Sequence, residues 1–171
     1  MELNDFKYYI IPFKNMMYRL ALRLLKNKED AEDAVQEAFM KLWLKRYELK
    51  IEGNLQALAM ITTKNLCLDK LKGNRKQIIS LDDDDILPDN LTPHARLEEI
   101  DIRNRIEAII DAFPEQQKII IHLRDIEGLS NDEVAEIVKM NKNAVKVALS
   151  RARTRLKNEL AKQFNYIKNE N

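Results

Sequence analysis

Residues 129–156 read LSNDEVAEIVKMNKNAVKVALSRARTRL, and this stretch predicts two helices joined by a tight turn. Ser130 is placed to cap the first helix, and Glu133 is placed to reach back to the amide of Ser130. Asn141 is placed to cap the second helix, and apolar residues recur at helical spacing along both. Two short helices in this order form a helix-turn-helix, which binds DNA through its second helix.

The second predicted helix carries several cations and no acidic residue between positions 142 and 157. A basic helix taken alone is often only a solvated surface helix. Here the capped first helix and the short turn favour DNA binding, because the apolar side of the second helix would dock on its partner and leave the cations facing a major groove. The residues predicted to contact DNA are Lys142, Asn143, Lys146, Val147, Ser150, Arg151 and Arg153.

Charge is unevenly distributed along the 171 residues, although the net charge is only +1. Acidic residues gather in 29–37 and 82–101, whereas basic residues gather in 64–76 and 139–157. Local charge rather than total charge therefore decides which partners each segment attracts. Hydrophobic residues make up 45% of the chain, and the small numbers of glycines (three) and prolines (four) favour helices over sheets.

Apolar residues recur every three or four positions in residues 5–26, with a break expected at Pro12, and again in 29–44, 55–71 and 98–113. Pro114 is expected to start a further helix that stops at Gly128. We therefore predict an all-α fold with two small helical domains, a three-to-four-helix bundle and a helix-turn-helix domain. The predicted boundaries are 1–76 for the first domain, 77–97 for an acidic linker and 98–171 for the second domain.

Several classes of protein are disfavoured by the sequence. Cys67 has no second cysteine to pair with, and neither an export signal nor a long apolar run is visible, so we expect a cytoplasmic protein. His94 and His122 have no partners for nucleophilic catalysis, so no enzyme is expected. The consecutive aspartates 82–85 would point in diverging directions, so no metal and no cofactor are expected.

Three strings resemble the extracytoplasmic-function sigma factors of bacterial RNA polymerase: DAEDAVQEAF at 30–39, FPEQQ at 113–117 and RDIEGLS at 124–130. The resemblance covers nearly the whole chain and implies a minimal two-domain sigma factor. In that family region two binds a coiled coil of the polymerase and opens the minus-ten promoter element, while region four reads the minus-thirty-five element. The linker takes the place of the middle domain of housekeeping sigma factors.

The resemblance also implies roles for two groups of residues in region two. The acidic face of the 29–44 helix would repel phosphate and therefore fits protein docking, and its predicted polymerase-binding residues are Asp33, Gln36, Glu37, Met40 and Lys41. The predicted minus-ten contacts are Asn54, Lys64, Asn65, Asp69, Lys72, Arg75 and Lys76, with the 52–56 loop holding a flipped base. Asp69 is equally placed to pair with a neighbouring lysine.

The implied partners are core RNA polymerase, promoter DNA and an anti-sigma factor, with no insertion into a membrane. Two departures from the family pattern stand in the helix-turn-helix, where Lys139 replaces a frequent glycine and Val147 and Ala148 replace frequent polar residues. A capping geometry other than a left-handed glycine is therefore expected at Lys139. Two further hypotheses remain open: a helix-turn-helix regulator that binds duplex DNA alone, and aspartates 82–85 that mimic nucleic acid in a basic channel of the polymerase.

Overall fold

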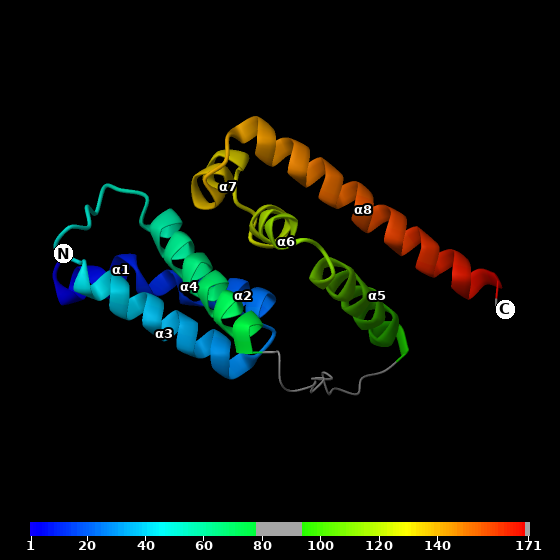
Figure 1. Ribbon diagram of the computed structural model, residues 1–171, viewed down its shortest axis with the longest axis horizontal. Coiled ribbons are helices and arrows are strands. Elements are labelled where there is room, and N and C mark those ends of the chain that lie inside the picture. The colour runs from blue at the N-terminus through cyan, green and yellow to red at the C-terminus, as the bar shows by residue number, and fades with distance from the viewer. Residues whose placement is uncertain (78–93, 170–171) are drawn as a thin grey trace.

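Helices make up two units in the computed structural model, which describes the backbone of residues 1–77 and 94–169 and the side chains of residues 1–74 and 100–165 (Figure 1). The first unit contains α1 (Leu3–Tyr9), the short 3-10 helix η1 (Ile11–Phe13), α2 (Lys14–Leu25), α3 (Lys28–Leu44) and α4 (Leu55–Gln77). The second contains α5 (His94–Asp111), α6 (Glu115–Ile121), the π-helical turn η2 (His122–Ile126), α7 (Asn131–Val138) and α8 (Lys142–Asn169). The prediction of an all-α fold is confirmed.

The first unit begins with a helix that is broken where the sequence predicts it. Pro12 lies in the first turn of η1, between the end of α1 and the start of α2, because proline cannot supply the amide that a continuous helix needs. Lys26 then closes α2 in the left-handed region at φ 54°. The side chain of Asn27 caps α3 by accepting a hydrogen bond from the amide of Asp30 at 2.9 Å.

The core of the first unit lies among α2, α3 and α4, which pack against one another. Met17, Leu20 and Met60 are fully buried there. The stripe of α3 that faces them contains the fully buried alanines 31, 34 and 38, whose small side chains allow close approach of the neighbouring helices. On the outer edge, α1 places Phe6 edge-on against Trp43, with ring centroids 5.2 Å apart.

The second unit differs from the prediction at one point, because the helix expected from Pro114 to Gly128 is not uniform. It changes after Ile121 into the π-helical turn η2, where the amide of Glu127 donates to the carbonyl of His122 at 3.0 Å. The wider turn leaves both His122 and Leu123 buried. The helix then stops at Gly128, which adopts φ 75°, as a glycine can without steric cost.

The predicted linker can be compared with the structure only in part. α4 ends at Gln77, one residue past the predicted end of the first domain, and α5 begins at His94 rather than at the predicted Glu98. Residues 78–93, which include the aspartates 82–85, lie outside the described residues. The earlier start of α5 has a local cause, since Ala95, Arg96 and Leu97 are strong helix formers.

The two units meet along a seam where α2 lies against α6 and α4 lies against α7. Figure 1 shows α6 and α7 on the side of the first unit that α2 and α4 form. None of the helices within the described residues combines the length and the apolar character needed to span a membrane.

Candidate nucleic-acid and polymerase interfaces

The helix-turn-helix has both of the predicted caps. The amide of Glu133 donates to Oγ of Ser130 at 3.2 Å, and the amide of Ser130 donates to Oε2 of Glu133 at 2.7 Å. At the second helix, Oδ1 of Asn141 accepts a hydrogen bond from the amide of Ala144 at 2.7 Å. These bonds satisfy amides that would otherwise lack partners at the helix starts, so they define where α7 and α8 begin.

The turn between α7 and α8 keeps the left-handed geometry without a glycine. Lys139 adopts φ 55° and ψ 46°, and its amide donates to the carbonyl of Ala135. The helix is thus closed without a left-handed glycine, as expected, but the lysine takes the same left-handed conformation that a glycine would. A side chain in this region crowds the following carbonyl at a cost of about 1–2 kcal/mol, which the packing of α7 and α8 offsets.

The recognition helix α8 faces the rest of the unit with a buried stripe of Val145, Leu149 and Ala152. Its other side is open to solvent, and Val147 lies there with 49% of its surface exposed. The exposed residues on that side include all of those predicted to contact DNA: Lys142, Asn143, Lys146, Val147, Ser150, Arg151 and Arg153. The structure therefore brings this predicted set together on one continuous surface.

Two cations of that surface are already paired within the unit. Arg153 donates from Nε and from one terminal nitrogen to the two carboxylate oxygens of Asp125, at 2.9 Å and 2.5 Å, and this hydrogen bonding raises the pKa of Arg153. Lys142 donates to the Asp132 carboxylate at 2.8 Å. Both pairs tie α8 to the preceding elements, so these two cations orient the helix as well as presenting charge.

The outer side of α3 carries the residues predicted to bind polymerase. Asp33, Gln36, Met40 and Lys41 are exposed and Glu37 is half-buried, while the buried stripe of the helix faces the opposite way. Met40 exposes 64% of its surface between these polar side chains. The set forms one face at the spacing of successive helical turns, as predicted.

The predicted minus-ten residues of α4 fall into separate groups. Asn65, Asp69 and Lys72 are exposed and lie along one side of the helix at intervals of four and three residues. Lys64 points elsewhere and is only 8% exposed, and burial together with the nearby Lys139 lowers its pKa. The side chains of Arg75 and Lys76 lie outside the described ones.

Asn54 has two structural roles at the start of α4. Its Oδ1 accepts a hydrogen bond from the amide of Ala57 at 3.0 Å, and its Nδ2 donates to Glu136 of α7 at 2.7 Å. The residue thus caps α4 and joins the two units across the seam. Asn54 is exposed, but both ends of its amide are already hydrogen-bonded, whereas Lys64 is buried.

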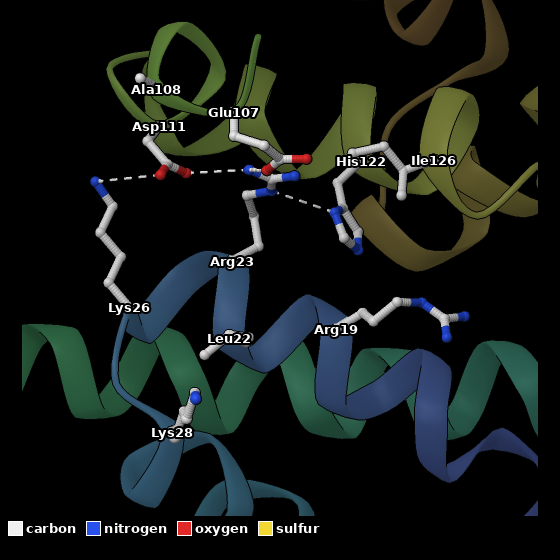
Figure 2. A pocket seen from close by; sticks show the side chains of 10 residues that line it. All are labelled: Arg19, Leu22, Arg23, Lys26, Lys28, Glu107, Ala108, Asp111, His122 and Ile126. Atoms are coloured by element: carbon white, nitrogen blue, oxygen red, sulfur yellow. Dashed lines mark hydrogen bonds and ion pairs between the residues drawn. The ribbon is translucent and has the colours of Figure 1, made fainter. Parts of the chain in front are cut away.

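A set of ion pairs across the seam was not predicted from the sequence. Arg19 forms a fork on Glu127, with Nε and a terminal nitrogen 2.7 Å and 2.6 Å from the two carboxylate oxygens. One turn later, Arg23 pairs with Glu107, lies 3.2 Å from Asp111 and donates to Nδ1 of His122 at 3.4 Å. Figure 2 shows Arg23 pointing from α2 to these three residues, with Lys26 beside it on Asp111.

Glu127 is the most strongly perturbed acid of the seam. Burial alone would raise its pKa, but the hydrogen bonds from Arg19 and His122 outweigh burial and hold the pKa at about 2. His122 Nε2 lies 3.2 Å from the Glu127 carboxylate, and both side chains are 2% exposed. A cleft of about 810 Å³ opens beside these pairs, between α2 and the second unit. No local motif announces the contacts of Arg19, Arg23 and Lys26 with the second unit, because each joins residues 84 to 108 positions apart.

Comparison with known proteins matches each of the two units to a region of a known family. A model of Sigma-70 region 2 matches residues 10–77, and a model of Sigma-70 region 4 matches residues 103–156. The extracytoplasmic-function (ECF) RNA polymerase sigma factor SigW of Bacillus subtilis is 26% identical over 159 residues, which cover 86% of this chain and 84% of SigW. The chain belongs to the extracytoplasmic-function sigma factors. Proteins of this family direct core RNA polymerase to promoters and initiate transcription, as the sequence resemblance implied.

Other relatives agree with this assignment. The ECF sigma factor SigE of Mycolicibacterium smegmatis is 28% identical over 151 residues, which cover 85% of this chain but only 58% of SigE. RNA polymerase sigma factor SigV of Bacillus subtilis is 29% identical over 154 residues, which cover 90% of this chain and 90% of SigV.

Two solved structures share the fold of this sigma factor. The sigma factor RpoE from Bartonella quintana, solved with the anti-sigma factor NepR, matches with a TM-score of 0.75 at 21% identity, over 93% of this chain and 98% of RpoE. CnrH, solved with the cytosolic domain of CnrY, matches with a TM-score of 0.67 at 18% identity, over 91% of this chain and 87% of CnrH.

Proposed function

We propose that this chain directs core RNA polymerase to promoters by dividing three tasks among three helices. In this proposal α3 docks on the polymerase, α4 contacts the minus-ten element and α8 reads the minus-thirty-five element, with unit boundaries near residues 76 and 98. The observation that carries the proposal is the sorting of charge by face. The open side of α8 presents cations, whereas the open side of α3 presents carboxylates.

The docking role of α3 is supported by the mixture of groups on its exposed side. Asp33 and Glu37 can pair with arginines of a partner helix, while Met40 offers a flexible apolar contact between them. Further apolar surface continues beyond this face, since Leu44 is 73% and Tyr47 is 68% exposed. A carboxylate face with exposed apolar residues suits a protein partner better than it suits a phosphate backbone.

The minus-thirty-five role of α8 is supported by exposed cations that form no ion pair within the described residues. Lys146 and Arg151 have no ion pair among the described residues and are exposed, so they are free to bind bases or phosphates. Val147 offers an apolar contact that fits the methyl group of thymine. Arg153, held by Asp125, serves first to position the helix.

The minus-ten role of α4 is supported by its exposed row of Asn65, Asp69 and Lys72. An amide and a carboxylate can hydrogen-bond the edges of unpaired bases, and a lysine one turn further can neutralise a phosphate. Lys64 and Asn54 lie on the seam side, so they reach DNA only after the units separate.

The same proposal covers partners, location and chemistry. The solved relatives were captured with an anti-sigma factor and with the cytosolic domain of CnrY, which supports an inhibitory protein partner for this chain. The protein works in the cytoplasm, where its polymerase works. It catalyses no reaction itself, because phosphodiester chemistry belongs to the polymerase.

Run-off transcription from a promoter library with purified core polymerase tests the proposal. The double variant Asp33→Lys/Glu37→Lys should lose core binding and all transcription, whereas Glu48→Lys, at an exposed acid outside that face, should lose neither. Lys146→Ala should keep core binding and weaken promoters that depend on the minus-thirty-five element. Tight binding of the chain to duplex DNA without any association with polymerase would instead support a stand-alone regulator.

A further inference from the structure

The first unit turns a purely basic side of α2 toward the second unit. No acidic residue occurs between Asp5 and Glu29. Within that stretch Arg19, Arg23 and Lys26 follow at intervals of four and three residues, so they lie on one side of the helix, and we call them the α2 stripe. Three cations at this spacing cannot neutralise one another, so the stripe needs anions from elsewhere.

Carboxylates of the second unit supply those anions in the closed chain. Glu127 pairs with Arg19, and Glu107 pairs with Arg23. Asp111 lies between Arg23 and Lys26, with its carboxylate oxygens 3.2 Å from a terminal nitrogen of Arg23 and 3.9 Å from Nζ of Lys26. The Arg23 side chain is 7% exposed in this arrangement, so its charge is hidden from any other partner. Because hydrogen bonds from Arg19 and His122 hold the pKa of Glu127 at about 2, its pair with Arg19 stays ionised at neutral pH.

The basic side of α2 continues onto α4, the helix proposed to contact the minus-ten element. The two helices pack on each other, and Lys64 of α4 lies at the same seam, 8% exposed and close to Lys139. Asn54 is bonded across that seam to Glu136. The surface of the first unit that faces the second therefore carries the α2 stripe and Lys64 of α4, and carboxylates of the second unit pair with the cations of α2.

The dimensions of a promoter require this seam to open. The minus-ten and minus-thirty-five elements lie roughly 25 base pairs apart, which is about 85 Å along the duplex. A compact chain of 171 residues has a radius of gyration of only about 16 Å, so its closed form cannot reach both.

We propose that the α2 stripe is a further contact for the phosphate groups of promoter DNA, which carboxylates of the second unit occupy while the chain is closed. Phosphate and carboxylate accept the same forked hydrogen bonds from a guanidinium, so one can replace the other on Arg19. Opening exposes the stripe beside α4 at the moment when α4 meets DNA. The inference rests on the proposed minus-ten role of α4.

The salt dependence of promoter binding by the reconstituted holoenzyme tests the contact. Arg19 and Lys26 are about half exposed, so the variant Arg19→Ala/Lys26→Ala should fold normally. Loss of two phosphate contacts should reduce the slope of log K against log salt by about 1.8. Between 50 and 200 mM salt, the ratio of the wild-type binding constant to that of the variant should therefore fall about 12-fold. Lys14→Ala removes an exposed cation from the opposite side of α2 and should leave the slope unchanged. An unchanged slope in the double variant would overturn the proposal.

Direct binding of the free chain to promoter duplex tests the masking. Glu107→Gln/Glu127→Gln should loosen the seam and tighten DNA binding several-fold, and adding Arg19→Ala/Lys26→Ala should abolish that gain. Equal binding by the wild type and the double glutamine variant would show that the carboxylates mask nothing. Wild-type holoenzyme is assayed for run-off transcription in parallel. If it selects promoters and the stripe variants behave like the wild type, the inference alone fails; if it selects none, the proposed function fails.

Discussion

Replacement of Lys139 by glycine should stabilise the protein, although it removes a whole side chain. Lys139 holds φ 55° in the turn between α7 and α8, where any residue with a Cβ is strained by about 1–2 kcal/mol. Glycine relieves that strain but adds about 0.4–1 kcal/mol of conformational freedom to the unfolded chain. The net expectation is a gain of about 1 kcal/mol in the free energy of unfolding, or a rise of about 2–4 °C in Tm.

A second variant separates the backbone effect from the effect of charge. Lys139 lies near the buried Lys64 and contributes to lowering its pKa, so removing either ammonium relieves some repulsion. Lys139→Ala removes the charge but keeps the strained backbone, whereas Lys139→Gly removes both. The difference between the two variants is therefore free of the charge effect and equals the strain minus the conformational freedom that glycine adds, about 1 kcal/mol in favour of glycine.

Urea denaturation followed by circular dichroism measures both variants, since the described structure is helical in both units. The slopes of free energy against urea should match that of the wild type, because neither change alters the surface exposed on unfolding. If the glycine variant is no more stable than the alanine variant, the strain at position 139 does not exceed the conformational freedom that glycine adds to the unfolded chain, and the expected stabilisation is refuted.

Three further predictions concern DNA affinity, acid stability and capping. Lys146→Ala should weaken minus-thirty-five binding and lower its salt slope by about 1. Lys142→Ala should have a smaller effect, because Lys142 already pairs with Asp132. Equal losses of affinity for the two variants in a filter-binding titration would contradict this ranking. Glu127→Gln should lower the free energy of unfolding at neutral pH. This loss relative to the wild type should disappear as pH falls from about 4.5 to about 2, because the carboxylate with its lowered pKa stabilises the fold only while it is ionised. A loss of stability that does not change with pH in urea titrations would count against the ion pair. Asn141→Ala should cost about 1 kcal/mol of unfolding free energy through loss of the α8 cap, and a cost near zero would mean that water satisfies the Ala144 amide equally well.

Local sequence was sufficient for the helices and for the faces of two of them. The capping box of Ser130 and Glu133, the cap by Asn141 and the break at Pro12 all stand where the sequence predicts them. The stripe of α3 is buried as its spacing predicts. These features were predictable because capping, proline geometry and helical periodicity depend on residues within a few positions of one another.

Tertiary packing decided two backbone features that the sequence pattern did not show. The π-helical turn after Ile121 and the left-handed Lys139 are both exceptions to the preferences of their residues. Packing on each side of these turns over-determines the backbone, so tertiary contacts offset a local cost that a sequence pattern counts as unfavourable.

The sequence by itself determined where α7 and α8 begin, which side of α3 and of α8 is apolar, and that the open side of α3 is acidic while that of α8 is basic. Only the tertiary structure decided how the charged groups are used. It paired Arg153 with Asp125, turned Lys64 into the seam, and joined Arg19 to Glu127 across 108 positions of sequence. An ion pair depends on distances of a few ångströms between side chains, and for residues this far apart in the chain such distances exist only once the two units have packed.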